Sequence, residues 1–375
     1  MIIGIDGNEA NELNRVGVNQ YAFEVLLGIY RLQGIWSKKH KFIVYLKKQP
    51  ISELPKAKKG FEYKVLPGGG NWIVTKLTPH LLFGSPKPDV FFTPSHYVPP
   101  FSLCPRVCTI HDLGYLKFSG QFRKFDFWQL FLWSAYSVIV SKIVIAVSNS
   151  TKDDIVRHYP FAEKKTVVTH EGYDDSRFNE NISQEDVRRV KTKYHIVDDY
   201  VLFLGTLKPS KNVESLIEAF SRVIPTFPDI KLVIAGKKGW LYDSIFHKVE
   251  ELNLKSEVIF TDFFPEEDKP GLIKGAKVFV IPSFWEGFGL DALSAMAVGT
   301  PVVTSKAGSL LEVVGEAGVY IDPYSVDSIV QGLLKVLKAD KTEYNRLVEA
   351  GLTRVKNFSW DKTARETLKV LESAK

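Results

Sequence analysis

The chain has 375 residues, 45% hydrophobic and 25% charged, a composition typical of a soluble globular protein large enough for two domains. Its two cysteines, Cys104 and Cys108, have no Cys or His cluster around them, so we expect no disulfide and no zinc site. The N-terminal residues lack the basic and apolar regions of a signal peptide. The most membrane-like stretch, Leu130–Val140, falls short of the ~20 residues of a spanning helix. We therefore expect a cytoplasmic location.

The net charge of +6 is concentrated in the first half of the chain. Residues 1–180 carry 23 Lys+Arg and 16 Asp+Glu, whereas residues 181–375 carry 26 and 27. The densest basic residues are Lys38, Lys39, Lys41, Lys47, Lys48, Lys56, Lys58 and Lys59. A solvated surface is the favoured interpretation, and attraction to anionic lipid headgroups at the inner membrane face is the alternative. We find no nucleic-acid motif and expect no nucleic-acid partner.

Short apolar segments alternate with helical patterns from end to end, which predicts an α/β fold with two parallel sheets. The predicted strands of the first half are Ile2–Ile5, Phe42–Leu46, Val90–Thr93, Val107–Ile110, Ile143–Val147 and Thr166–Val168. Those of the second half are Val201–Leu204, Leu232–Ala235, Val258–Phe260, Val278–Ile281, Val302–Thr304 and Val319–Ile321. The polar stretch 174–199 is interpreted as the interdomain region, and the predicted domains are residues 1–180 and 181–358.

Two features of the first half follow predicted strands. Gly17 lies between the first strand and a helix. His111 and Asp112 directly follow the predicted strand Val107–Ile110, at the end of a strand where α/β folds hold ligands. A lone histidine is more often structural, and that alternative stays open. Gly68-Gly69-Gly70 lacks the Lys-Ser/Thr of a phosphate-binding loop and is interpreted as a flexible loop.

A predicted helix over residues 122–142 is unusually aromatic. Its large apolar residues include Phe122, Phe125, Phe127, Trp128, Phe131, Leu132 and Trp133. Core packing is the favoured interpretation. Contact of these rings with a membrane interface, with Arg123 and Lys124 as charge partners, is the alternative.

Two segments of the second half carry the strongest signals for chemistry. Lys211 stands at a predicted helix start that follows the strand Val201–Leu204, where charge and helix dipole together suit a diphosphate. A surface lysine is the alternative. Glu286 stands in a glycine-containing turn between the strand Val278–Ile281 and a helix whose apolar residues recur at helical spacing. Exposed N–H groups at that helix start suit an anion or a sugar hydroxyl.

The stretch Glu286-Gly-Phe-Gly-Leu290, followed by Ala295-Met-Ala297 and Gly299-Thr-Pro-Val302, resembles the signature of retaining glycosyltransferases of family four, the group 1 type that includes mannosyltransferases. Three further segments resemble the family: the stretch ending in His111-Asp-Leu, Gly205 to Asn212, and Gly308 to Gly315. The resemblance implies the GT-B fold, with two Rossmann-like domains facing across a cleft. Residues 359–375, with Trp360, Ala364, Leu368 and Leu371 on one helix face, resemble the closing helix that crosses back to the first domain. A core helix of the second domain is the alternative.

The resemblance also implies the reaction and its residues. It implies metal-independent, cofactor-free transfer of a hexose from a UDP- or GDP-linked donor to a glycan or lipid-linked acceptor. Glu286 would bind sugar hydroxyls and steady the positive anomeric centre, and His111 would hold the sugar from the opposite domain. The other implied donor-binding residues are Gly17, Lys208, Lys211, Gly287, Phe288, Gly289, Leu290, Asp291, Ser294 and Glu312.

The chain departs from the family pattern at four positions. Asp291 and Leu311 replace prolines, Thr206 replaces an arginine whose phosphate contact Lys208 could take up, and Ser294 replaces a second glutamate that holds the ribose. We expect an active enzyme with weakened ribose recognition, in which Asp291 could substitute for the missing carboxylate. The alternative is a GT-B binding or partner subunit that no longer catalyses. The Glu-Gly-Phe-Gly stretch disfavours a third reading, a nucleotide-sugar epimerase or a phosphorylase.

Overall fold

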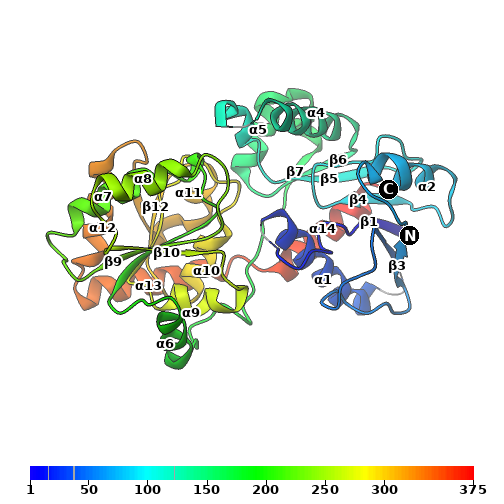
Figure 1. Ribbon diagram of the computed structural model, residues 1–375. Helices are drawn as coiled ribbons and strands as arrows, with labels where there is room; N and C mark the ends of the chain where they lie inside the picture. The colour runs from blue at the N-terminus through cyan, green and yellow to red at the C-terminus, as the bar shows by residue number, and fades with distance from the viewer. Residues whose placement is uncertain (16, 37–38, 122) are drawn as a thin grey trace. The chain divides into compact units, whose positions relative to one another are not determined.

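The computed structural model describes residues 1–15, 17–36, 39–121 and 123–375, which form two compact units (Figure 1). The first unit comprises Met1–Gly172 and Phe358–Lys375, and the second comprises Tyr173–Asn357. Residues 173–180, which the sequence interpretation placed in the first domain, therefore group with the second unit. Of the residues singled out above, Lys38 and Phe122 lie outside the described part of the chain.

The first unit is built on a parallel sheet in the order β3-β2-β1-β4-β5-β6-β7. Its strands are β1 (Ile2–Asp6), β2 (Lys41–Leu46), β3 (Phe61–Val65), β4 (Val90–Thr93), β5 (Arg106–Ile110), β6 (Ile143–Ala146) and β7 (Thr166–Val168). Its helices are α1 (Val18–Trp36), α2 (Thr78–Phe83), α3 (Gly114–Lys117), α4 (Lys124–Val140), α5 (Asn149–His158) and α14 (Trp360–Ser373). The strands are almost wholly buried except for β3 and β7 at the two edges of the sheet.

The second unit is built on a parallel sheet in the order β10-β9-β8-β11-β12-β13. Its strands are β8 (Tyr200–Leu204), β9 (Lys231–Ala235), β10 (Val258–Asp262), β11 (Val278–Ile281), β12 (Val302–Ser305) and β13 (Gly318–Ile321). Its helices are α6 (Gln184–Lys193), α7 (Val213–Val223), α8 (Asp243–Glu251), α9 (Lys269–Lys274), α10 (Leu290–Ala297), α11 (Leu310–Val314), α12 (Val326–Leu337) and α13 (Lys341–Val355).

The two sheets confirm the predicted α/β fold with paired Rossmann-like units. Each predicted strand is present, and β3 is the one described strand that the sequence analysis missed. The interpretation of residues 174–199 as interdomain chain is wrong, because this stretch forms α6, which packs on α9 inside the second unit. Over the described part of the chain, no helix is both long and apolar enough to cross a bilayer.

The last helix returns to the first unit, as predicted. The helix α14 packs along α1, with Trp360, Ala364 and Leu368 buried. A Cβ on Gly28 of α1 would lie 2.6 Å from the Ala364 Cβ, so glycine allows the two helices to approach closely. The alternative of a core helix in the second domain is wrong.

Candidate active site

The strand order of the second unit reverses between β8 and β11. These strands are hydrogen-bonded neighbours, although β9 and β10 separate them in the sequence. The loops at their carboxyl ends therefore diverge to opposite sides of the sheet and leave space between them, which is where open α/β sheets bind ligands. Lys211 follows β8 and Glu286 follows β11, so both predicted residues lie at this switch point.

Lys211 and Glu286 are in direct contact. The Lys211 Nζ donates to Glu286 Oε1 at 2.5 Å, and the Ser283 hydroxyl donates to the same oxygen at 2.7 Å. The side chains of Lys211 and Glu286 are 18% and 14% exposed, so both are largely screened from water yet still accessible to a ligand. A cation and a carboxylate therefore stand together at the end of the sheet, 75 residues apart in sequence.

The loop after β12 fixes the backbone of Glu286. A Cβ on Gly308, which has a positive φ of 59°, would lie 2.1 Å from the Glu286 carbonyl oxygen, so only glycine allows this approach. The next residue, Ser309, donates through N–H to the Glu286 carbonyl at 3.2 Å and through its hydroxyl to the Phe288 carbonyl at 2.7 Å. The segment Gly308 to Gly315, singled out by resemblance, thus contains the hydrogen-bond donors that hold the turn at Glu286.

The loop that carries Lys211 is tied to the end of β11 by Asn212. This residue adopts the left-handed conformation (φ 57°), and its side-chain amide donates to the carbonyls of Pro282 and Pro323 at 3.1 and 2.7 Å. Beside it, a Cβ on Gly236 would lie 2.1 Å from the Gly205 carbonyl oxygen, so the loops after β8 and β9 are in close contact. Both arrangements set the position of Lys211.

Gly289, which has a φ of 95°, is the N-cap residue of the helix α10. Phe288 is buried, while Gly287, Leu290 and Asp291 are half-buried. Ser294 is buried, and its hydroxyl donates to the Leu290 carbonyl of its own helix at 3.2 Å. It therefore presents no carboxylate where the family has its second glutamate.

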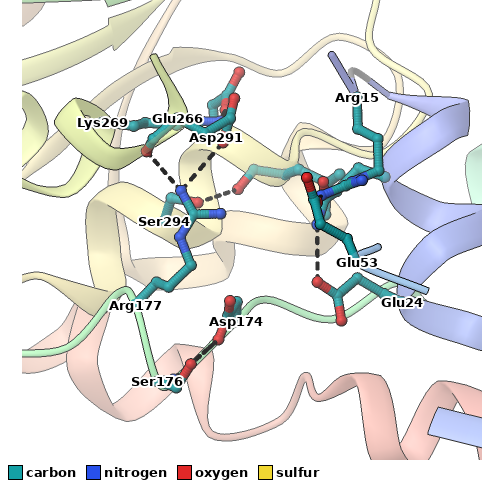
Figure 2. Close-up of polar contacts among 12 residues, drawn as sticks. Arg15, Glu24, Glu53, Asp174, Ser176, Arg177, Glu266, Lys269, Asp291 and Ser294 are labelled. Atoms are coloured by element: carbon teal, nitrogen blue, oxygen red, sulfur yellow. Dashed lines mark hydrogen bonds and ion pairs between the residues drawn. The ribbon is translucent and has the colours of Figure 1, made fainter. Parts of the chain in front are cut away.

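Asp291 is held in an ion pair. Its carboxylate lies 2.7 Å from the Lys269 ammonium. Burial lowers the pKa of Lys269, but the carboxylates of Asp291 and Glu266 outweigh burial and raise it. Arg177 in turn donates to the Glu266 backbone carbonyl at 2.6 Å, and Figure 2 shows these side chains grouped beside Ser294. Asp291 would have to leave Lys269 before it could replace the missing glutamate.

The remaining predicted donor residues of the second unit surround the same loops. The Lys208 ammonium lies 5.1 Å from the Trp240 ring centroid, a cation–π contact on the loop before Lys211. Glu312 lies in the first turn of α11, three residues after Ser309, which hydrogen-bonds to the turn at Glu286. Among the described residues, no group of three or more His, Cys, Asp or Glu could hold a metal ion.

In the first unit, His111 lies at the carboxyl end of β5. Its Nδ1 lies 3.3 Å from Glu171 Oε1, and its Nε2 lies 3.0 Å from the Pro94 carbonyl oxygen. Both partners accept, so both ring nitrogens donate, as in an imidazolium. Burial lowers the pKa of His111, but the Glu171 carboxylate outweighs burial and raises it. Asp112 accepts from the Gly114 N–H at 2.8 Å, so it orders the turn rather than the imidazole.

The loop after β1 carries the predicted Gly17. Its φ of 49° is left-handed, and no atom lies within 4 Å of a Cβ built there, so its backbone faces open space at the start of α1. Next to it, Arg15 pairs with Glu53, as Figure 2 also shows. At the end of β1, burial raises the pKa of Asp6 to about 6, and its carboxylate accepts from the Asn8 N–H at 3.0 Å.

Sequence reasoning missed Glu171 and the serines Ser283 and Ser309. Glu171 follows β7 at the same edge of the sheet as His111, so its place after a strand was an available signal. The serines have no such signal, because their contacts with the Glu286 turn depend on how separate loops meet.

The sequence is similar to those of known glycosyltransferases. The sequence profile described as glycosyl transferases group 1 matches residues 186–354, and that of glycosyltransferase family 4 matches residues 59–177. The chain is 31% identical to O-antigen chain mannosyltransferase B of Escherichia coli over 286 residues, which cover 75% of this chain and 74% of that protein. It is 30% identical over 267 residues to the serotype-specific mannosyltransferase WbdA of Escherichia coli, covering 69% of this chain and 32% of that longer protein.

The fold has solved counterparts. The structure of Anabaena Alr3699/HepE in complex with UDP and glucose matches with a TM-score of 0.75 and 17% sequence identity. The match covers 99% of both chains. At this identity the likeness concerns the fold.

Proposed function

This chain belongs to the family-four glycosyltransferases, and we propose that it moves a hexose from a nucleoside-diphosphate sugar to a glycan or glycolipid acceptor with retention at the anomeric carbon. The Lys211–Glu286 pair at the switch point of the second sheet carries the proposal. A diphosphate leaving group requires positive charge, and an oxocarbenium-like centre requires negative charge. A preorganised ammonium and carboxylate in contact supply both.

In this proposal the second unit binds the donor. Lys211, with Lys208 beside it, neutralises the diphosphate, and backbone N–H groups from Gly287 to Leu290 add to that charge. Glu286, released from Lys211 by the phosphate, binds sugar hydroxyls and steadies the anomeric centre. Ser294 and Asp291 face the ribose, and Glu312 lies beside the donor.

The first unit contributes the acceptor side. His111 holds the transferred sugar by exchanging its contact with the Pro94 carbonyl for a sugar hydroxyl, and Gly17 brings backbone close to the donor phosphates. Because lysines and N–H groups neutralise the diphosphate, the reaction needs no metal and no further cofactor. The relatives named above are mannosyltransferases, which favours mannose as the transferred sugar. The donor nucleotide in this proposal is UDP or GDP. We place the enzyme in the cytoplasm, at the inner membrane face when its acceptor is lipid-linked.

Ser294 supports a second candidate function, a binding or partner subunit that has lost full donor recognition. Its hydroxyl is bonded to its own helix, and Asp291 is bound to Lys269. The intact Lys211–Glu286 pair favours the enzyme.

Calorimetric titration of the metal-free protein with UDP, GDP and ADP separates the two candidates. We expect one nucleotide to bind with a Kd below about 1 mM, or about −4 kcal/mol, and the matching sugar donor to be turned over or slowly hydrolysed. A Lys211→Met variant should lose this binding, whereas Lys231→Met, at the opposite end of the sheet, should keep it. Binding without any donor turnover would favour the partner subunit.

A further inference from the structure

The helix α4 is apolar on two faces. Its inner face packs against the core of the first unit through Phe127, Leu130 and Phe131, as core packing predicted. Its outer face is also apolar, and there core packing is wrong: Phe125 is 76% exposed, Leu132 60% and Ile139 58%. A helix that is hydrophobic all round is ordinarily buried on every side. This one has 17 residues, too few to span a bilayer, and Figure 1 shows it at the edge of the first unit.

The apolar residues of the outer face form a continuous stripe. Phe125, Trp128, Leu132 and Ile139 are exposed and recur at helical spacing. The half-buried Ala135 and Tyr136 lie on the same face, and all six positions fall within an arc of roughly 100° on the helix. At 1.5 Å per residue the helix is about 25 Å long, so the stripe is an extended apolar strip rather than an isolated ring.

Neighbouring loops widen this stripe near its end. The Tyr136 hydroxyl donates to the Pro100 carbonyl, which brings the loop with Phe101 (67% exposed) beside α4. On another side, Lys165 donates to the Ile139 carbonyl at 2.9 Å and lies 5.4 Å from the ring centroid of Phe161, itself 59% exposed. Exposed apolar side chains from three segments therefore gather around α4.

Cations flank the stripe at both ends. Arg123 and Lys124 are exposed at its start. At the other end, Lys142 lies two residues beyond the helix and donates to the Lys375 carbonyl at 3.0 Å, and Lys165 donates to the Ser141 carbonyl at 2.9 Å. Asp126 is the acidic residue within the helix. Aromatic and aliphatic side chains between basic residues match the interface of an anionic bilayer, where rings enter the headgroup boundary and lysines reach the phosphates.

We propose that the outer face of α4 docks the first unit on a bilayer surface that contains anionic phospholipid. The helix lies in the plane of the interface with Phe125, Trp128 and Leu132 inserted and the flanking cations against lipid phosphates. This inference deepens the lipid-linked part of the proposed function. It is tested on vesicles without donor or acceptor, so that its failure is separate from failure of the transferase reaction.

The test is co-sedimentation of the full chain with vesicles of phosphatidylcholine alone or mixed with phosphatidylglycerol. We expect binding to the mixed vesicles that weakens with salt. The triple variant Phe125→Ser, Leu132→Ser, Ile139→Ser should reduce vesicle partitioning at least tenfold and keep its Tm and its nucleotide affinity. A matched control, Val197→Ser with Leu241→Ser, removes side chains 82% and 60% exposed in the second unit and should bind as the wild type does.

A charge-reversed variant gives a second, independent readout. Arg123→Glu with Lys124→Glu should reduce the preference for phosphatidylglycerol by at least about fivefold for each cation, while Lys335→Glu with Lys356→Glu should not. Unchanged binding of the α4 triple variant would overturn the proposal. So would a wild-type chain that ignores vesicles but self-associates in sedimentation velocity through α4, because a second copy would then cover the stripe.

Discussion

The two units present their polar residues at the same edge of similar sheets, but they hold them differently. In the second unit, Lys211 and Glu286 bind each other. In the proposed function, each exchanges this partner for a part of the donor. In the first unit, His111 is enclosed between a carboxylate and a carbonyl of its own unit. Under the proposed function, the second unit therefore supplies an exchangeable pair of charged side chains, and the first supplies an imidazole held by two acceptors. Four predictions can break or sharpen this comparison.

The largest effect is expected for Glu286→Gln. It keeps the shape of the side chain but removes the negative charge, and it should lower kcat/KM about 10³-fold, the upper part of the range for one preorganised electrostatic group. Steady-state turnover of the donor identified by calorimetry measures this. Glu316→Gln, an exposed acid of the same unit, is the control. A loss below about tenfold would contradict the role given to Glu286.

The next effect is expected for Lys211→Met. Loss of the ammonium should lower kcat/KM about 100-fold and weaken nucleoside diphosphate binding, because the leaving group loses its cation. Lys211→Arg should restore part of the activity, whereas Lys231→Met should be silent. Equal loss of affinity for the nucleoside, which lacks phosphates, would show that the lysine acts on loop structure instead.

A smaller effect, in the direction of a gain, is expected for Ser294→Glu. A carboxylate at this position should tighten nucleotide binding about tenfold, or about 1.4 kcal/mol, if the ribose contact is missing in the natural chain. Calorimetry with the preferred nucleotide and its 2′,3′-dideoxy analogue measures it. The gain should vanish with the analogue, and Ser294→Gln should give less. An unchanged nucleotide affinity in Ser294→Glu would contradict weakened ribose recognition in the natural chain.

The smallest effect is expected for Glu171→Gln, and it depends on pH. Because the pKa of His111 is raised in the folded chain, its pairing with Glu171 stabilises the fold fully below the unfolded value of about 6.5 and is lost as pH rises through the folded pKa. The variant should therefore lose about 1 kcal/mol of unfolding free energy at low pH and progressively less above pH 6.5. Urea denaturation across this range measures it. A difference independent of pH would mean that Glu171 does not act through the imidazole.

Much of the fold could be predicted from sequence because buried parallel strands are continuous apolar runs. The strand β3 was missed since Glu62 and Lys64 interrupt it, which an edge strand tolerates. The stretch containing α6 was misread because its surface is mostly polar. Only Val187 and Val190 are buried within that helix.

The candidate site was predictable where one segment carries its own signal, as at Glu286 and Lys211. The contact between these two residues was not, because it depends on β8 and β11 being neighbours across an intervening pair of strands. Likewise, the aromatic composition of α4 predicted a core helix. Composition alone does not say which face of a helix the sheet covers.

One consequence concerns how such proteins can be built. The chain leaves the first unit after Gly172 and re-enters it at Phe358. A Cβ on Gly172 would lie 2.2 Å from the Trp360 backbone nitrogen, so these two points are close together. The Thr363 hydroxyl, bonded to the His170 carbonyl at 2.7 Å, fastens the two segments together. Topologically, Tyr173–Asn357 is an insert with adjoining ends. Replacing it with another unit of the same kind would require only two neighbouring joins and would leave the sheet of the first unit uncut.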